Sequence, residues 1–457
     1  MAQLQPVDRQ TFLANLRQSG LLEEREIAAV ADQLPEDAKS KHVARALMNR
    51  GLLTKFQAER LLSGRPTAFV LGQYRILDKL GRGGMGHVYK AEHRTMNRVV
   101  ALKVLSPKLI QSDRAQDLFL REVRAVARLV HANIVTAFDA NRMGDRYYLV
   151  LEYVNGPNLD QLVRQQGPLP VGVACDFVRQ VALGLQYAHE QGMVHRDIKP
   201  ANILIQKDAR TGQGAVKISD FGLARLQEAD TTEDVGMGTI LTKENTVMGT
   251  PDFLSPEQAR NLHHVDIRSD LYSLGCTFYY LLTGKVPFPG GTTLEKLIRH
   301  TTEAPEPVDK LRPELPADVT TIVERLMAKD PGDRFQTPAQ LAAALEPLVA
   351  KDSGGWSTAR PERFPSGEGD PQDAVAAAGS DSEIESISSV EAALAGTLLP
   401  DLSPTPISTG IIASTSRISR QVHREQRRRF RFAFLLSTIV VGGLISLLAL
   451  LGFLLGH

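Results

Sequence analysis

The sequence predicts an α+β fold in two lobes, with a small helical domain before it. Between residues 74 and 349, short β-branched and aromatic runs such as YRILDKL and YYLVLEYV come first. Long amphipathic stretches such as ACDFVRQVALGLQYAHEQG follow them. Strands grouped before helices are typical of α+β proteins rather than of alternating βαβ units. Before residue 74 only helical periodicity is present, so we expect a separate helical unit there.

The composition is that of a globular protein with no dominant charge. Hydrophobic residues make up 43% of the 457 residues, charged residues make up 23%, and the net charge is +1. No overall field favours nucleic acid, so we expect no nucleic-acid partner. The two cysteines, Cys175 and Cys276, fall in apolar helical stretches. We expect them to be small buried hydrophobes in a reducing compartment, because two cysteines make no disulfide framework.

Residues 1–66 show apolar residues at three- and four-residue spacing, which predicts helices. The segment SGLLEEREI at 19–27 resembles RGLLTKFQ at 50–57. In each, a glycine can end one helix, and Glu23 or Thr54 lies near the start of the next. We expect a bundle of about four short helices. Its simplest role is packing without chemistry, and a regulatory role is the alternative.

The last hundred residues divide into a polar and an apolar part. Residues 350–426 are poor in aromatic residues and rich in Ser, Ala, Gly and Pro, which predicts a disordered linker. Phe432–Leu455 is free of charged residues. As a helix it would extend about 36 Å, which exceeds a bilayer core of about 30 Å. We therefore expect one transmembrane helix rather than a buried core helix.

The charges beside this apolar segment predict its orientation. Five arginines stand just before it, and only Gly456 and His457 follow it. Basic residues at a membrane span stay on the cytoplasmic side. We therefore expect a single-pass protein of the cell (inner) membrane, with everything before residue 432 in the cytoplasm. The five arginines are Arg424, Arg427, Arg428, Arg429 and Arg431.

A glycine-rich segment from Gly81 to Val88 fits the pattern G-x-G-x-x-G-x-V. Alone, G-x-G-x-x-G is a weak signal and also occurs in Rossmann turns. Here it lies between two strand-like runs, which favours a β-hairpin folded over nucleotide phosphates. Lys103 follows in the apolar run VALK. A lysine there is costly to bury without a negative partner.

Two further segments decide the expected chemistry: HRDIKPAN at 195–202 and DFG at 220–222. With the glycine-rich segment and Lys103, they resemble the eukaryotic-like protein kinase family of the serine/threonine type, in its bacterial form. The resemblance implies a bilobal protein kinase fold over 74–349, with a β-rich N-lobe and an α-helical C-lobe. It also implies ATP and Mg²⁺ as cofactors and proteins as substrates.

The resemblance also assigns catalytic roles. Asp197 would accept the proton of the substrate hydroxyl, and Lys199 would neutralise charge on the transferred phosphate. Asn202 and Asp220 would bind magnesium. Lys103 would hold the α- and β-phosphates and pair with an acid on the next helix. We expect Glu122 to be that acid, with Asp117 as the alternative.

The nucleotide would lie between the glycine-rich segment and a hinge around Glu152 to Val154. Leu80 and Val88 would pack on the adenine above, and Leu204 would lie beneath it. Leu151 would close the back of the pocket. By resemblance, the residues expected to contact the nucleotide are Leu80, Gly81, Arg82, Gly83, Gly84, Met85, Gly86, His87, Val88, Ala101, Lys103, Glu152, Val154 and Leu204.

The segment from 220 to 257 would be the activation segment, ending in Ser255-Pro-Glu257 where Ala-Pro-Glu is commoner. Arg196 would bind a phosphate carried by this segment, so autophosphorylation, in trans within a homodimer, would switch the enzyme on. Lys199 and Thr250 both indicate serine or threonine as acceptor. The phosphorylation candidates are Thr231, Thr232, Thr239, Thr242 and Thr246, with Thr242 and Thr246 preferred. The resemblance also implies that Glu257 pairs with Arg334 and that Asp270 braces the catalytic loop, residues 195–202. We expect His195 to pack in the core rather than to act as an acid or base.

Two alternatives compete with an active protein kinase. A pseudokinase usually lacks one of Lys103, Asp197 or Asp220, and all three are present. A small-molecule phosphotransferase of related fold would not need GTPDFLSPE at 249–257, which by resemblance shapes a groove for peptide substrates.

Overall fold

The computed structural model describes residues 6–110, 112–144, 146–207, 214–222, 251–260 and 265–349. The expected linker at 350–426, the expected membrane span at 432–455, Thr250 and the five candidate threonines lie outside the described residues. Within the described ranges, no helix combines the length and the apolar character needed to cross a bilayer.

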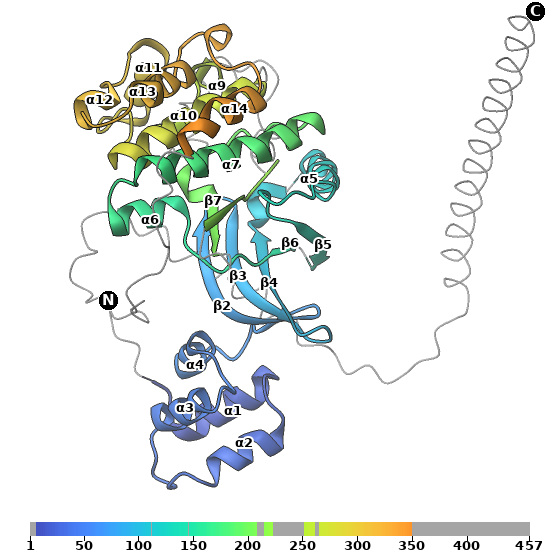
Figure 1. Ribbon diagram of the computed structural model, residues 1–457. Coiled ribbons are helices and arrows are strands. Elements are labelled where there is room, and N and C mark those ends of the chain that lie inside the picture. The colour runs from blue at the N-terminus through green and yellow to red at the C-terminus, as the bar shows by residue number, and fades with distance from the viewer. Residues whose placement is uncertain are drawn as a thin grey trace, which may run out of the picture. The chain divides into compact units, whose positions relative to one another are not determined.

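The N-terminal part is a bundle of short helices, as predicted (Figure 1). Its helices are α1 Arg9–Ser19, α2 Glu24–Ala31, α3 Ser40–Asn49 and α4 Lys55–Leu62. Gly20 ends α1 in the left-handed conformation, with φ of 63°. Glu23 and Thr54 are the N-caps of α2 and α4, and each forms a capping box with the residue three positions later. The apolar core of the bundle includes Phe69, beyond the expected limit at residue 66.

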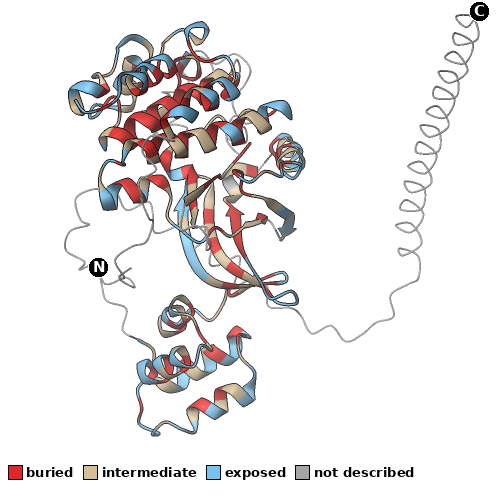
Figure 2. Ribbon diagram, viewed as in Figure 1, coloured by how far each residue is buried: buried red, intermediate tan, exposed pale blue. Residues whose placement is uncertain are grey.

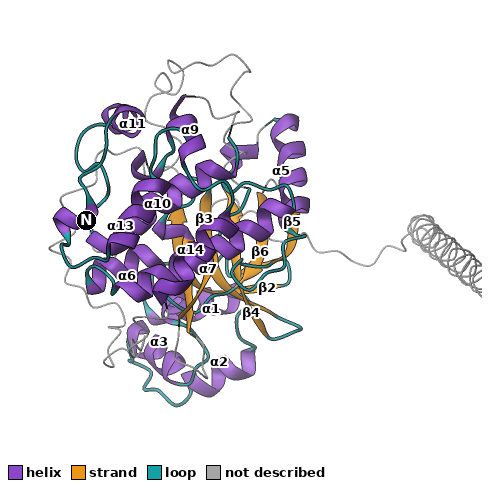
Figure 3. Ribbon diagram, turned by 45° about the horizontal axis from the view of Figure 1, so that its top comes forward, coloured by secondary structure: helices purple, strands orange, loops and turns teal. Residues whose placement is uncertain are grey.

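The N-lobe is an antiparallel sheet with strand order β1-β2-β3-β4-β6-β5. Its strands are β1 Val70–Leu71, β2 Tyr74–Gly83, β3 Gly86–His93, β4 Arg98–Leu105, β5 Ala137–Met143 and β6 Arg146–Glu152. One 3₁₀ turn, η1 Pro107–Ile110, leads into the long helix α5 Asp113–Val126. Figure 3 shows the strands as one layer, with α5 beside them. The β-branched and aromatic runs of the sequence therefore form the strands that they predicted.

The C-lobe is mainly helical, and in its described residues the strands form a small hairpin. Figure 2 shows that the helices α7 (Val171–Glu190) and α10 (Ile267–Thr283) carry the most continuous buried surface of this lobe. The hairpin is β7 Ile203–Lys207 and β8 Gly214–Ile218. The helices are α6 Leu159–Gln166, α7 Val171–Glu190, α9 Pro256–Arg260, α10 Ile267–Thr283, α11 Thr293–Thr302, α12 Val308–Leu311, α13 Ala317–Leu326 and α14 Pro338–Val349. Short 3₁₀ turns are η2 Pro200–Asn202, η3 Pro251–Phe253 and η4 Pro331–Asp333.

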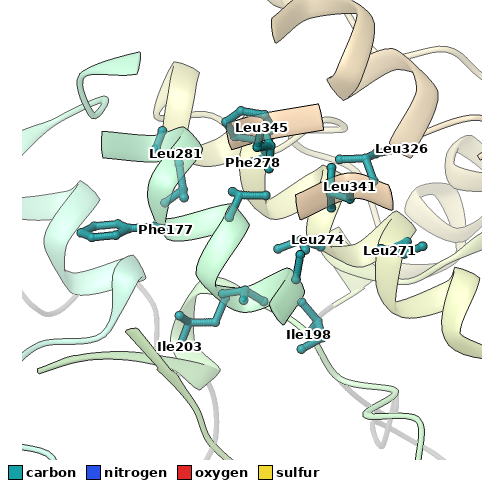
Figure 4. Packing of buried hydrophobic residues seen from close by; sticks show 14 of the residues in the cluster. Phe177, Ile198, Ile203, Leu271, Leu274, Phe278, Leu281, Leu326, Leu341 and Leu345 are labelled. Atoms are coloured by element: carbon teal, nitrogen blue, oxygen red, sulfur yellow. The ribbon is translucent and has the colours of Figure 1, made fainter. Parts of the chain in front are cut away.

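The core of the C-lobe anchors the loops that carry the site. Figure 4 shows Phe177 of α7, Leu274 and Phe278 of α10, and Leu341 and Leu345 of α14 packed together. Ile198, between the residues expected to be catalytic, is 1% exposed and belongs to this same cluster. Because its side chain is held in a close-packed interior, the loop around it has little freedom to move. Both cysteines are buried as free thiols, as expected.

Candidate active site

The glycine-rich segment forms the predicted hairpin between β2 and β3. Gly83 pairs with Gly86 at its tip, and the N–H of Ser106 donates to the carbonyl oxygen of Met85 at 2.9 Å. Gly86 has φ of 141°, and a Cβ there would lie 2.1 Å from the carbonyl oxygen of Val104. Glycine is therefore required at this position, where β3 passes close to the backbone of β4.

Lys103 lies on β4 beneath this hairpin, opposite Val88 on β3 and Leu149 on β6. It is 5% exposed. Its Nζ lies 2.9 Å from Oδ1 of Asp220 and 3.9 Å from Sδ of Met85. The buried lysine thus has the negative partner that its burial requires, and the pair joins the two lobes.

Asp220 stands two residues after the end of the β8 strand, in a strained backbone conformation. Its φ is 67°, a value that non-glycine residues adopt rarely and mostly at functional sites. Burial opposes ionisation of this carboxyl group, but Lys103, with a smaller contribution from Lys199, outweighs burial and lowers its pKa. Asp220 is therefore a carboxylate at neutral pH.

Of the two acids on α5 considered as partners of Lys103, Glu122 is 7% exposed and Asp117 is exposed. Oε2 of Glu122 lies close to Gly222: a Cβ atom added to this glycine would be 2.8 Å from that oxygen. Glu122 therefore faces the DFG segment. Its pairing with Lys103 stays a prediction, because in this structure Lys103 is paired with Asp220.

The catalytic loop holds Asp197 from two sides. Nζ of Lys199 lies 2.8 Å from Oδ2 of Asp197. The amide nitrogen of Asn202 donates to the same oxygen at 3.0 Å and to the backbone oxygen of Asp197 at 2.8 Å. The Asp197 carboxylate keeps 21% of its side-chain surface exposed. It is therefore oriented by its own loop and still accessible to a hydroxyl group.

Asp270 of α10 braces this loop from below, as expected. Its two carboxylate oxygens accept the backbone N–H groups of His195 and Arg196, each at 2.7 Å. Burial raises the pKa of Asp270, against the effect of these two donors. Arg196 has φ of 69°, so the bracing holds the loop in a second strained conformation.

His195 is fully buried and links the catalytic loop to the DFG segment. Its Nδ1 accepts the N–H of Asp197 at 3.2 Å, so Nε2 carries the hydrogen and donates to the carbonyl oxygen of Ser219 at 2.8 Å. Its ring also meets Phe221 edge to face at 4.5 Å. The packing role expected for His195 fits these contacts.

Asn202 and Asp220 lie at the same end of the β7–β8 hairpin. Ile203 pairs with Ile218, and the N–H of Ser219 donates to the backbone oxygen of Asn202 at 2.8 Å. Because Asn202 donates its amide nitrogen to Asp197, its amide oxygen remains the acceptor end. An amide oxygen and an ionised carboxylate are ligands that Mg²⁺ prefers, so these two residues fit a magnesium ion.

The strand β6 ends in a hinge with a buried ion pair. Nζ of Lys217, on β8, lies 3.1 Å from Oε2 of Glu152, which also accepts the N–H of Thr136 at 3.2 Å. Val154 is buried, and Leu204 lies beside Asn158 in a β-bridge. Glu152, Val154 and Leu204, all expected at the adenine, thus lie where β6 meets the C-lobe.

An apolar pocket opens behind this hinge, between α5, the sheet and the DFG segment. Leu151 lines it, which agrees with its expected place at the back of the nucleotide pocket. The lining residues are Val123, Val126, Val135, Ala137, Leu149, Leu151, Ile218, Asp220 and Phe221.

The expected pair Glu257–Arg334 forms in the C-lobe. The fully buried Arg334 donates from two nitrogens to the two carboxylate oxygens of Glu257, at 2.7 and 2.9 Å. Burial opposes ionisation of Glu257, but Arg334 and the hydroxyl of Ser269 outweigh it and lower the pKa. This bidentate pair fixes α9, at the end of the expected activation segment, to the α10 and η4 region.

Three contacts at the site were not anticipated from the sequence. They are the Lys217–Glu152 pair, a hydrogen bond of 2.8 Å from Gln258 to the backbone oxygen of Arg196, and an ion pair of 2.5 Å between Lys296 and Asp252. Only Gln258 had a local signal, because it stands next to Glu257 of the Ser-Pro-Glu motif.

The comparisons with known proteins agree with this geometry. The family model described as "Protein kinase domain" matches residues 74–344. A similar curated protein is the serine/threonine-protein kinase pkn2 of Myxococcus xanthus, 40% identical over 61% of this chain and 33% of its own length. The PknB kinase of Mycobacterium tuberculosis is 38% identical over 60% of this chain and 42% of its own length.

A probable serine/threonine-protein kinase of Clostridium perfringens is 36% identical over 61% of this chain and 38% of its own length. The chain thus spans less than half the length of these curated relatives. A solved structure, the PknI kinase domain of M. tuberculosis, has a TM-score of 0.48 at 27% identity, covering 62% of this chain and 99% of that one. Since the family model matches more than half of the residues, the chain belongs to the protein kinase domain family.

Proposed function

We propose that this protein is a serine/threonine protein kinase, which transfers the γ-phosphate of ATP to serine and threonine hydroxyl groups of proteins. The observation that carries the proposal is the convergence of Lys103, Asp197, Lys199, Asn202 and Asp220. They come from β4, the catalytic loop and the DFG segment. Contacts of 2.8 to 3.0 Å link Lys103 to Asp220, and link Lys199 and Asn202 to Asp197. The N–H of Ser219, next to Asp220, donates to the backbone oxygen of Asn202 at 2.8 Å and so connects the two groups. The names of the relatives support the same acceptor class.

In this proposal the chain acts by positioning and by charge. Asp197 orients the acceptor hydroxyl and takes its proton, and Lys199, bound to that carboxylate, neutralises charge on the phosphate that moves. Lys103 holds the α- and β-phosphates. The hairpin from Gly81 to Val88 covers the nucleotide with backbone N–H groups. Glu152 and Val154 hold the adenine edge through their backbone.

Asn202 and Asp220 would hold magnesium, which supplies positive charge against the β- and γ-phosphates. Lys103 is the cation that offsets the charge of Asp220; it outweighs the effect of burial and keeps the carboxylate ionised and ready to bind a metal. The chain thus keeps the ligand in its charged form before any metal is present.

Peptides that differ only in the acceptor test the proposed acceptor class. The full chain is incubated with labelled ATP, Mg²⁺ and four matched peptides carrying Ser, Thr, Tyr or Ala at the same position. We expect label on the Ser and Thr peptides alone. Label on the Tyr peptide at a similar rate would contradict the acceptor class, and binding of ATP without label on any peptide would favour a pseudokinase.

We further propose that activation requires phosphorylation of the activation segment, in trans between two copies. Support comes from Arg196, which precedes Asp197 and whose backbone oxygen is held by Gln258 next to the segment. A phosphate on Thr242 or Thr246 would be the partner of its guanidinium. Replacing both threonines by alanine is expected to lower activity. Full activity of the double variant, after phosphatase treatment of both proteins, would contradict this part.

We also propose that residues 432–455 anchor the protein in the cell membrane with the kinase domain in the cytoplasm. The support is the charge-free run and the arginines that precede it. Fractionation of cells should find the full chain with the membranes, resistant to high salt. Replacing Leu444 and Leu448 by arginine should release it, and retention of that variant would point to another attachment.

A further inference from the structure

The helical domain before the kinase domain contacts the strand that leads into the glycine-rich hairpin. The contact is made by the capping box of α4, Thr54 and Gln57. Oγ1 of Thr54 donates to the carbonyl oxygen of Leu77 at 2.6 Å, and Nε2 of Gln57 donates to that of Ile76 at 2.7 Å. Gln57 is 3% exposed, so this polar contact is closed to water.

Each of the two side chains both donates and accepts a hydrogen bond. Oγ1 of Thr54 accepts the N–H of Gln57 at 3.2 Å, and the amide oxygen of Gln57 accepts the N–H of Thr54 at 2.9 Å. These bonds cap the helix, while the donor ends bind β2. The equivalent box of α2 is formed by Glu23 and Glu26. Ionised glutamates accept but do not donate, so that box can only cap.

The two carbonyl groups belong to an irregular part of β2. In a regular strand the carbonyls of consecutive residues point to opposite edges, yet those of Ile76 and Leu77 both meet α4. The pairing with β3 is broken at this point, because Ile76 pairs with Ala91 while Asp78 pairs with Lys90. Leu77 is therefore the extra residue of a β-bulge. Bulges bend a strand and so change the direction of the residues after the bend.

The residues after this bulge lead into the glycine-rich hairpin, which begins at Gly81. β1 pairs with β2 only at Tyr74 and Arg75, so beyond them α4 covers the outer edge of β2. Apolar contacts add to the polar ones, because Phe56 of α4 packs against both the helical core and the core of the sheet. These contacts hold the bulge in one conformation.

We propose that Thr54 and Gln57 are positioning residues for nucleotide binding: they fix the β2 bulge and so set the direction of the glycine-rich hairpin over the phosphates. The helical domain is then part of the nucleotide-binding machinery, although it lies outside the region that the family model matches. The inference rests on the proposed function, because it requires that the hairpin covers ATP.

The test compares full-length variants by ATP affinity and by kinetics. Gln57→Glu keeps the acceptor that caps α4 and removes the donor to Ile76. Thr54→Val removes both the donor to Leu77 and the oxygen that caps α4. Thr54→Ser keeps both functions, and Glu26→Ala is the matched control, since it breaks the box of α2 away from β2. Calorimetry gives the dissociation constant of ATP, and peptide phosphorylation gives kcat and both KM values.

We expect Gln57→Glu and Thr54→Val each to weaken ATP binding roughly fivefold, the effect of one lost hydrogen bond, and to raise KM for ATP in proportion. Peptide KM should not change, and Thr54→Ser and Glu26→Ala should match the wild type. If Gln57→Glu does not fold, Thr54→Val against Thr54→Ser decides. Unchanged ATP affinity, or an equal loss in Glu26→Ala, would overturn the inference. Absence of ATP binding by the wild type would instead count against the proposed function.

Discussion

Nζ of Lys103 and Oδ1 of Asp220 lie 2.9 Å apart, and this contact joins the N-lobe sheet to the DFG segment. Lys103 is almost fully buried, so each charge depends on the other for compensation. The lysine expected to hold phosphate thus forms an ion pair with the carboxylate expected to hold magnesium. Binding of nucleotide and metal together would separate this pair and give each charge a new partner.

Replacing Lys103 by methionine should therefore affect both partners. It removes the phosphate contact and leaves the partly buried Asp220 carboxylate without the cation that lowers its pKa. We expect peptide phosphorylation to fall at least about a hundredfold, as for the loss of a group that stabilises developing charge. The exposed Lys285 supplies the control, since Lys285→Met should keep wild-type activity. A residual rate within tenfold of the wild type would show that Lys103 is not required.

Breaking the ion pair between Lys217 and Glu152 at the hinge should change KM for ATP rather than kcat. Lys217→Met removes the cation that holds Glu152, whose backbone is expected to bind adenine. The carboxylate would then turn away from this partly buried site. We expect KM for ATP to rise roughly fivefold, equivalent to about 1 kcal/mol, with little change in kcat. A fall in kcat at constant KM would mean that Lys217 acts on the DFG segment instead.

Because of the Glu257–Arg334 pair, the free energy of unfolding should decrease as the pH falls into the acid range. The pKa of Glu257 is lowered in the folded protein from 4.5, so the unfolded chain takes up a proton first as the pH falls. This contribution is complete above the unfolded pKa and is lost as the pH drops through the lowered value. Glu257→Gln, which leaves Arg334 buried without its anion, should cost about 3 kcal/mol at pH 7.

Urea unfolding at pH 7 and at pH 3.5 measures this difference. The gap between wild type and Glu257→Gln should be widest at pH 7 and should shrink at pH 3.5. If the difference in unfolding free energy is the same at both pH values, the variant is destabilised by lost packing and not by lost charge compensation.

Because of the buried His300, stability should also depend on pH between about 6.5 and 4, above the range in which Glu257 acts. It is fully buried on α11, and burial, together with the nearby Lys329, lowers its pKa from 6.5 to about 3. Between these values only the unfolded chain carries the proton, so stability should fall by about 1.4 kcal/mol for each unit of decreasing pH. His300→Gln removes this proton, and its stability should fall less steeply from pH 6.5 to 4. Parallel curves for the two proteins would contradict the assignment.

The residues that act through local motifs were predictable from their spacing. Contacts between distant residues were predicted only where the family resemblance supplied them, as for Glu257 with Arg334. Asp197, Lys199 and Asn202 lie within one loop, so their spacing in the chain already carries their arrangement. Likewise, the N-cap positions of Glu23 and Thr54 follow from chemistry within one turn of helix. The structure confirms the predicted helices and the division into a β-rich and a helical lobe.

The pairing of charges over long separations could not be predicted in this way. Lys217 and Glu152 are 65 residues apart, and neither has a spacing that points to the other. Lys103 had several acids within reach, and only tertiary packing selects Asp220 in this structure. The binding of β2 by Thr54 and Gln57 could not be predicted for the same reason. The sequence pattern does not indicate that β2 lies beside their donor groups.

The most direct test of the account is phosphoryl transfer by Asp197→Asn. Asparagine keeps the size of the side chain and can still face Lys199, but it cannot accept the proton of the acceptor hydroxyl. Single-turnover transfer from labelled ATP to a serine peptide should fall about a thousandfold, while calorimetry shows ATP binding close to that of the wild type. Transfer by Asp197→Asn at the wild-type rate would contradict the assignment of Asp197 and, with it, the proposed mechanism.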